Sequence, residues 1–139
     1  IAKVNGQIIE NNSMGIGNGT SKVQLVAIDD VSSGKADMSR AFEIIQNDHY
    51  VIFVSHTPSV FSKVVKEYHP NLLLAGHTHG GQIRLGRYGL YPPGKFEDSS
   101  EPITLISNGY GTSLIPFRLG ASPECHVITF NGKYCTEYK

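Results

Sequence analysis

The middle of the chain carries a strand–helix–strand pattern, which restricts the fold more than any other feature of the sequence. Residues 50–54 and 72–75 are apolar runs of strand length. Between them, Thr57 precedes a proline and an apolar stripe at helical spacing, which ends at His69. Two strands joined in this way lie parallel in one sheet, with a right-handed crossover. The sequence therefore predicts an α/β fold in which the residues that follow both strands meet at one sheet edge.

Further elements flank this unit on both sides. A second helix is expected over residues 38–45, with Asp37 as its N-cap. Strands are expected at 8–9 and 23–28, and the polar, glycine-rich residues 11–20 between them are expected to form a loop. After the second apolar run, the pattern changes to short strands with glycine- and proline-rich loops between them. These strands are expected at 82–85, 103–107 and 116–119 and in a hairpin over 125–138.

Three histidines follow the two strands of the central unit. His56 comes after 50–54, whereas His77 and His79 come after 72–75 in the sequence Gly-His-Thr-His-Gly-Gly-Gln. Imidazole is the commonest protein metal ligand near neutral pH. Because ligands gather at the carboxyl ends of neighbouring parallel strands, the three imidazoles are expected to converge there. We therefore predict that His56, His77 and His79 are metal ligands.

Several classes of metal site do not fit this spacing. A metallo-β-lactamase-type motif requires Asp-His where this chain has Gly81 and Gln82, and a cupin-type motif requires glutamate in place of Ile83. A thiolate zinc site requires cysteines paired at short spacing, which this sequence does not contain.

Charge and cysteine content narrow the function classes further. The 139 residues carry 12 lysines and arginines against 12 aspartates and glutamates, so no basic excess favours nucleic acid as a partner. No apolar run is long enough to cross a membrane.

Cys125 and Cys135 flank Asn131-Gly132, a type I′ hairpin signal whose expected register pairs Cys135 with Ile128. The two thiols would then point to opposite faces, so no disulfide is expected.

The histidine motifs together resemble those of a known enzyme family. Residues 54–58 (Val-Ser-His-Thr-Pro) and 76–82 are similar to the last two motifs of calcineurin-like metallophosphoesterases. Residues 107–113, with the Pro-Phe-Arg and Pro-Glu that follow, are similar to the signature of one bacterial branch, which includes small phosphodiesterases and lipid-precursor pyrophosphatases, often membrane-associated. The resemblance extends over roughly residues 23–130.

The resemblance implies a fold, a ligand set and an activity. The fold would be half of a four-layer α-β-β-α sandwich, a mixed sheet with helices on one face and a C-terminal run of antiparallel strands. His56 and His77 would bind one divalent metal ion, and His79 would bind a second. Imidazole ligands favour Mn, Fe, Ni or Zn over Ca or Mg. The full-length parent would hydrolyse phosphomonoesters or phosphodiesters with a metal-activated water.

The family also uses motifs that this sequence lacks. Asp-x-His, Gly-Asp-x-x-Asp and Gly-Asn-His would supply a bridging aspartate, an asparagine ligand and the histidine that protonates the leaving group. None occurs here, and Asp29-Asp30 are expected to form a turn instead. Residues 1–139 are therefore expected to be the C-terminal part of a single domain, without catalytic residues and inactive alone. Partners would be the missing N-terminal half or a second copy, through an exposed sheet edge and apolar face.

The sequence is compatible with other functions and with more than one location of the protein. The histidines could form a structural or regulatory zinc site in a non-catalytic β-rich domain, or they could bind no metal. Substrates could be small phosphoesters or lipid phosphates, and the protein could lie in the bacterial cytoplasm or at a membrane through an anchor before Ile1. 

Two arginines and three tyrosines are judged less informative. Arg84 and Arg118 could hold a phosphate, although surface arginines usually do not. Tyr88, Tyr91 and Tyr110 are expected to be half-buried loop anchors, with a cleft-lining role as the alternative.

Overall fold

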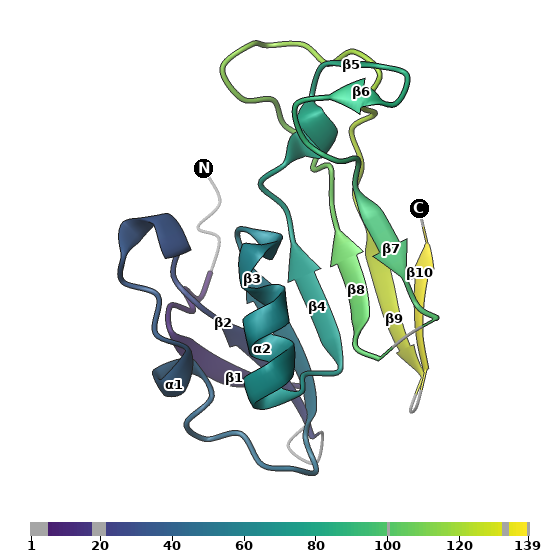
Figure 1. The fold of residues 1–139 in the computed structure, drawn as a ribbon. Helices are drawn as coiled ribbons and strands as arrows, with labels where there is room; N and C mark the ends of the chain where they lie inside the picture. The colour runs from purple at the N-terminus through teal and green to yellow at the C-terminus, as the bar shows by residue number, and fades with distance from the viewer. Residues whose placement is uncertain (1–5, 18–21, 100, 132–133, 139) are drawn as a thin grey trace.

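A mixed β-sheet forms the centre of the computed structural model, which describes residues 6–17, 22–99, 101–131 and 134–138. Within these residues the sheet has six strands in the order β1-β2-β3-β4-β8-β7 (Figure 1). The four inner strands are parallel, namely β2 (Val23–Ala27), β3 (Tyr50–Ser55), β4 (Leu72–Ala75) and β8 (Ile103–Ile106). The two edge strands, β1 (Asn12–Ile16) and β7 (Lys95–Glu97), run antiparallel to their neighbours. Two separate antiparallel pairs complete the fold, β5 (Arg84–Leu85) with β6 (Tyr88–Gly89) and β9 (Val127–Asn131) with β10 (Tyr134–Tyr138).

The helices α1 (Met38–Ala41) and α2 (Phe61–Tyr68) cover one face of the sheet (Figure 1). Short 3-10 turns stand at η1 (Val31–Ser33), η2 (Pro58–Val60) and η3 (His79–Gly81). The first of these turns follows β2, the second leads into α2, and the third follows β4. The turns at the ends of β2, β3 and β4 all lie at the carboxyl edge of the sheet, where the candidate site is found.

The core lies between the helices and this face of the sheet. Alternate residues of the central strands point to it, including Phe53 of β3, which has no exposed surface. The ring of Phe42 stacks near Phe53, with 5.8 Å between centroids, and against Tyr68 of α2 at 4.2 Å. The opposite face contributes Ile52, Leu72 and Leu105, which are also buried. Because β3 and β4 are buried on both faces, they are largely apolar.

The predicted α/β class is confirmed, with helices on one face of a mixed sheet and an additional C-terminal antiparallel pair, consistent with half of a metallophosphoesterase sandwich. The parallel pairing of β3 with β4 through the α2 crossover is also confirmed. None of the helices in the described residues has the length and apolarity needed to cross a bilayer.

Several expected elements are wrong. Residues 12–16 of the expected glycine-rich loop form β1, because backbone pairing with β2 needs no apolar side chains, and residues 8–9 are not a strand. The helix expected over 38–45 ends at Ala41, where Phe42 adopts a non-helical ψ near 1°. The strand expected at 82–85 is reduced to the two residues of β5.

The C-terminal expectations also need correction. Residues 116–119 form no strand, and Leu119 makes only an isolated bridge with Ile83. The hairpin exists, but Cys135 pairs with Phe130 rather than with Ile128, a register two residues different. Cys125 is a free, exposed thiol, as expected.

Candidate metal centre

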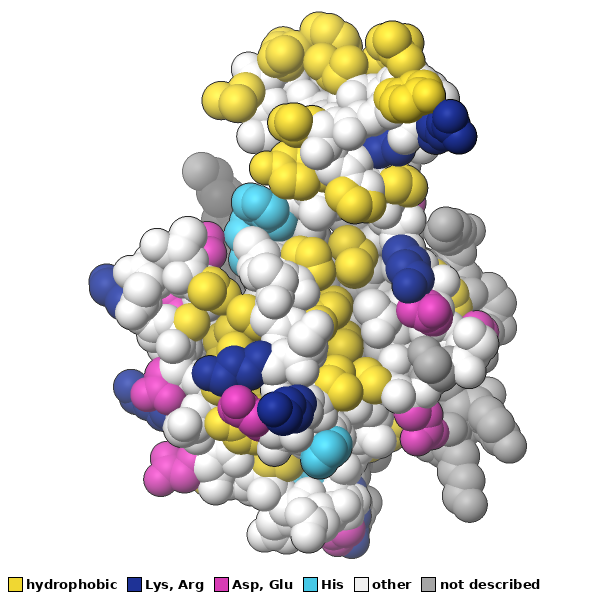
Figure 2. All heavy atoms as spheres, in the orientation of Figure 1, with side chains coloured by type: hydrophobic (Ala, Val, Ile, Leu, Met, Phe, Trp, Pro, Cys, Tyr) yellow, Lys and Arg dark blue, Asp and Glu magenta, His cyan; other side chains and the backbone are white. Residues whose placement is uncertain are grey.

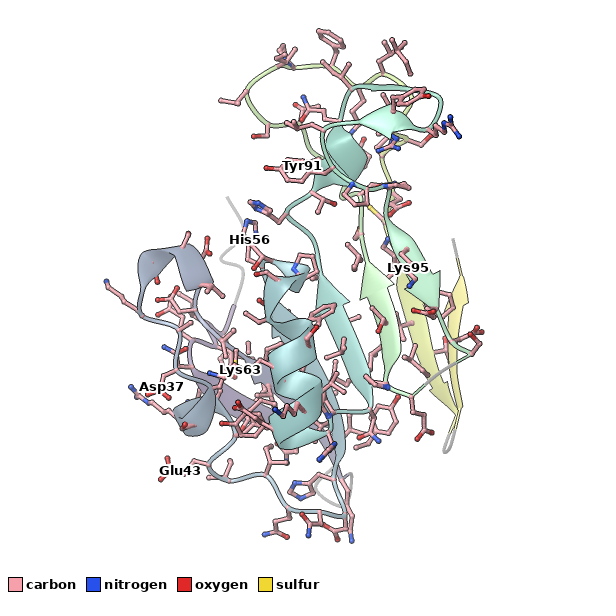
Figure 3. The ribbon with its side chains drawn as sticks, viewed as in Figure 1. Asp37, Glu43, His56, Lys63, Tyr91 and Lys95 are labelled. Atoms are coloured by element: carbon pink, nitrogen blue, oxygen red, sulfur yellow. The ribbon has the colours of Figure 1, made fainter. Side chains whose placement is uncertain are left out.

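His56 and His77 meet at the carboxyl edge of the sheet. Ser55 of β3 lies beside Ala75 of β4 in parallel register, so the residues that follow each strand start from neighbouring positions. The backbone N–H of Gly76 donates to the carbonyl of His56 at 3.2 Å, which extends the pairing past the strand ends. His77 Nδ1 lies 2.9 Å from His56 Nε2, and the ring centroids are 4.8 Å apart. Figure 3 shows His56 below Tyr91 in that view.

The turn that carries His77 and His79 has an unusual backbone. His77 adopts a φ of 69° and His79 a φ of 48°, in the left-handed region that residues with a side chain rarely occupy. Gly80 follows with a φ of 61°, and an added Cβ there would overlap the side chain of Asn108. Strained backbone of this kind costs roughly 1–3 kcal/mol per residue and is concentrated at functional sites.

His79 lies apart from this pair. Its ring Nδ1 is 3.3 Å from Nη2 of Arg118, and its carbonyl accepts a hydrogen bond from Nη1 of the same guanidinium at 3.0 Å. Within the described segments of the chain, no group of three or more histidine, cysteine, aspartate or glutamate side chains is placed to hold a metal ion. The expected convergence is therefore found for His56 and His77 but not for His79.

Of the two arginines considered as surface residues, Arg84 is buried and Arg118 is half-buried. Arg84 is only 8% exposed and donates to the carbonyls of Gly80 and Arg87 at 3.1 Å and 2.9 Å. Arg118 is half-buried and donates to backbone carbonyls around it. Its acceptors are His79, Asn108, Gly109, Gly111 and Ala121. Both arginines hold the histidine turn in place through the main chain.

Gln82 ties a distant loop to the same turn. Its Nε2 donates to the carbonyls of Ser113, Ile115 and Phe117 at 2.9, 2.8 and 3.2 Å. Its Oε1 accepts from the backbone N–H of Ser113 at 2.7 Å. The single glutamine therefore fixes residues 113–117 next to the histidines.

Asp30 reaches the same sheet edge from the end of β2. The expected turn is confirmed, because the Asp30 carboxylate accepts from the backbone N–H of Ser32 at 2.9 Å and caps η1. That hydrogen bond, with smaller contributions from the charges of His56 and His77, lowers the pKa of Asp30 below its ordinary 3.8. The site therefore has a carboxylate close enough to interact electrostatically with both imidazoles. Its position could have been inferred from β2 lying parallel to β3.

The three tyrosines are exposed rather than half-buried, so the expectation of loop anchors is wrong. Tyr88 and Tyr110 are 68% and 76% exposed. Tyr91 packs edge-on toward His77, with 6.1 Å between the ring centroids. Tyr91 alone of the three therefore has a place beside the histidines.

Comparison with known proteins finds relatives that are named metallophosphoesterases. The uncharacterized protein YpbG of Bacillus subtilis (strain 168) is 35% identical over 133 residues, which are 95% of this chain and 51% of YpbG. YkuE of the same organism, named an uncharacterized metallophosphoesterase, is 32% identical over 118 residues, or 78% of this chain and 41% of YkuE. YkoQ, also named an uncharacterized metallophosphoesterase of this organism, is 27% identical over 142 residues, or 94% of this chain and 51% of YkoQ.

The chain is related to the metallophosphoesterases. This relationship agrees with the resemblance carried by the two histidine motifs. The chain spans about half the length of the curated relatives it matches. No family model matches it, and no solved structure matches it.

In this chain, the side chains of His56 and His77 fit a bound metal ion. Two imidazole nitrogens 2.9 Å apart can either share a proton or act as ligands toward one cation. The nearby charge of Asp30 favours a cation at this edge. Both donor atoms are imidazole nitrogens, and such ligands favour a transition metal over calcium or magnesium.

Proposed function

We propose that residues 1–139 supply histidine ligands to a larger metal-dependent enzyme that hydrolyses phosphomonoesters or phosphodiesters. The observation that carries this proposal is the 2.9 Å approach of His56 and His77 at the carboxyl edge of β3 and β4. The names of the relatives YkuE and YkoQ support the same reaction class.

The proposed ligand roles are those that the resemblance to the metallophosphoesterase motifs implies. His56 and His77 would hold one divalent ion, and His79 would hold a second, with Mn, Fe, Ni or Zn as candidates. Two such ions would polarise the phosphoryl oxygens and lower the pKa of a bound water. Arg118 and Arg84 would keep the two ligands of the turn in position, since they bind the main chain at His79 and Gly80.

We also propose that this chain is the C-terminal part of one catalytic domain and has negligible activity alone. A two-metal phosphoesterase site needs carboxylates as well as imidazoles, and the described residues contain no set of three or more histidine, cysteine, aspartate or glutamate side chains placed to hold a metal ion. The relatives are about twice as long, so the remaining ligands would come from the other half of the protein. That half would be the main partner of this chain, through the exposed edge of the sheet.

The test uses the full-length protein and a chromogenic diester, bis(p-nitrophenyl) phosphate, with Mn²⁺, Ni²⁺, Zn²⁺ or Fe²⁺ added in turn. His77→Ala should lower the metal-dependent rate by roughly 100-fold or more and reduce the bound metal. His49→Ala is the matched control, because His49 lies at the opposite end of β3, where its Nδ1 accepts a hydrogen bond from the backbone N–H of Gln46 at 3.2 Å. An unchanged rate in His77→Ala would contradict the proposal. Hydrolysis by residues 1–139 near the full-length rate would contradict the proposed inactivity.

Metal stoichiometry separates this proposal from a structural zinc site. A structural site would be one closed tetrahedron with one ion, whereas the proposed enzyme binds two. The contact of His79 with Arg118, away from the His56–His77 pair, does not favour a single three-histidine site.

A further inference from the structure

The histidine turn borders a hollow with mainly apolar walls. Its volume is about 370 Å³, which lies within the range of small-molecule sites. His77 and His79 stand at one side, and the remaining wall comes from the segments after η3 and from the 113–115 loop. The apolar members are Ile83, Leu90, Tyr91, Leu114 and Ile115.

A second hollow of about 460 Å³ adjoins the first. The two share His77, Thr78 and Tyr91, and the second adds Pro92 and Pro93. Figure 2 shows hydrophobic side chains gathered at this end of the molecule, next to a histidine. The candidate metal centre therefore opens onto an extended apolar surface rather than onto a polar one.

Among the residues that the structure describes, no lysine, arginine, aspartate or glutamate lines either hollow, and the histidines are the only titratable nitrogen groups in their walls. Two of the polar side chains that line the first hollow, Gln82 and Thr78, already have hydrogen-bond partners, and its wall also contains the hydroxyls of Tyr91 and Ser113. Both polar atoms of the Gln82 side chain bind the 113–117 backbone, and Thr78 Oγ1 accepts from the N–H of Gly80. These walls therefore offer few free hydrogen-bonding groups to a polar ligand.

The outer wall is a fixed structure rather than a loose tip. Leu114 is fully exposed and adopts a φ of 59°, a left-handed conformation that is unfavourable for leucine. Gln82 holds the residues on both sides of it, Ser113 and Ile115, through their carbonyls. Strained backbone is concentrated at functional sites. An exposed apolar side chain that is held in this way next to a candidate site therefore points to a ligand that it contacts.

We propose that this hollow binds the organic substituent of a phosphodiester, and that the substituent is an alkyl or aryl group rather than a nucleoside or a sugar. The inference rests on the proposed function, since the phosphoryl group would lie at the histidines. The substituent would then lie along Leu90, Tyr91 and Leu114. A nucleoside would lose hydrogen bonds to water in this hollow without replacing them, and that loss opposes binding.

The test measures how substrate chain length affects the full-length protein. The substrates are methyl, butyl and octyl p-nitrophenyl phosphate, kept below their micelle concentrations, and thymidine 5′-p-nitrophenyl phosphate. Burial of a methylene group is worth up to about fourfold in affinity, so KM should fall at least about tenfold from the methyl to the octyl ester. The thymidine ester should bind no better than the methyl ester.

Leu114→Asn tests the wall directly, because asparagine tolerates the left-handed conformation and should leave the fold intact. This variant should lose most of the dependence of KM on chain length. Leu85→Asn is the matched control. Leu85 is also an exposed leucine at this end of the molecule, but it does not line the hollow. It should retain the full dependence.

Direct binding separates this inference from the proposed function. Calorimetric titration with methyl-, butyl- and octylphosphonate needs no turnover. Affinity that rises with chain length in the wild type and not in Leu114→Asn supports the apolar site, even if no diester is hydrolysed. The inference would be overturned by affinity that does not depend on chain length, by a chain-length dependence that is unchanged in Leu114→Asn, or by tighter binding of the thymidine ester than of the methyl ester. Each of these results would leave the hydrolase proposal standing.

Discussion

Arg118 donates a hydrogen bond of 3.0 Å to the carbonyl oxygen of His79, a residue 39 positions earlier in the chain. The same guanidinium also donates to the carbonyls of Asn108 and Gly109, at 2.8 and 3.0 Å. Among the described residues it forms no ion pair. Arg118 thus binds backbone from two separate loops and fixes their distance from the histidine ring.

Replacing Arg118 with methionine should therefore loosen His79 selectively. We expect a loss of about 2 kcal/mol in unfolding free energy, from charge-assisted hydrogen bonds, and roughly 10–100-fold weaker metal binding at His79. Urea unfolding and metal analysis of the full-length protein would measure the two effects. Arg87→Met is the control, because Arg87 is exposed and contacts the side chain of Tyr88. Two metal ions retained at wild-type affinity in Arg118→Met would contradict this prediction.

Two glycines of the histidine motif should respond differently to alanine. A Cβ at Gly80 would overlap the amide of Asn108, and the backbone there is left-handed, so Gly80→Ala should cost about 2–3 kcal/mol. A Cβ at Gly76 would meet no atom within 4 Å, so Gly76→Ala should change the melting temperature little. Equal melting temperatures for the two variants would show that the turn is not packed as described.

The aromatic stack in the core should dominate stability. Phe53 is fully buried and lies near Phe42, so Phe53→Ala should lower the unfolding free energy by about 3–5 kcal/mol. Phe117→Ala, at a residue that is 54% exposed, should cost far less. Denaturant unfolding of both variants tests this, and a loss below about 1 kcal/mol in Phe53→Ala would contradict the assigned core.

Asp48 should make stability sensitive to acid. The Lys22 ammonium donates to its carboxylate and lowers the pKa of Asp48 below 3.8. The stabilisation is therefore fully present above the ordinary carboxyl pKa and is lost as the pH falls through the lowered value. Asp48→Asn should be slightly less stable than wild type at neutral pH and equal to it in strong acid. A difference that persists in strong acid would show that the charge of Asp48 is not its cause.

The central unit could be predicted from sequence because its signals are local. The apolar runs of β3 and β4, and Pro58 at the start of η2, each indicate their own structure. Parallel pairing then placed His56 and His77 at one edge without any further information. The metal ligation itself stays a prediction.

The errors arose where distant parts of the chain determine the structure. Residues 12–16 form a strand only because β2 offers an unpaired edge, and nothing in their glycine-rich sequence indicates this. Gln82 and Arg118 bind backbone carbonyls 33 and 39 positions away, so no spacing rule reveals them. Their burial depends on the completed fold.

The way Gln82 holds residues 113–117 has a consequence for how such proteins can diversify. The loop is held through its main chain, so its conformation depends little on which side chains it carries. Leu114 and Ile115 could therefore change during evolution while the loop keeps its shape and its distance from the histidines. A few substitutions there would offer a lineage new ligand preferences on an unchanged scaffold.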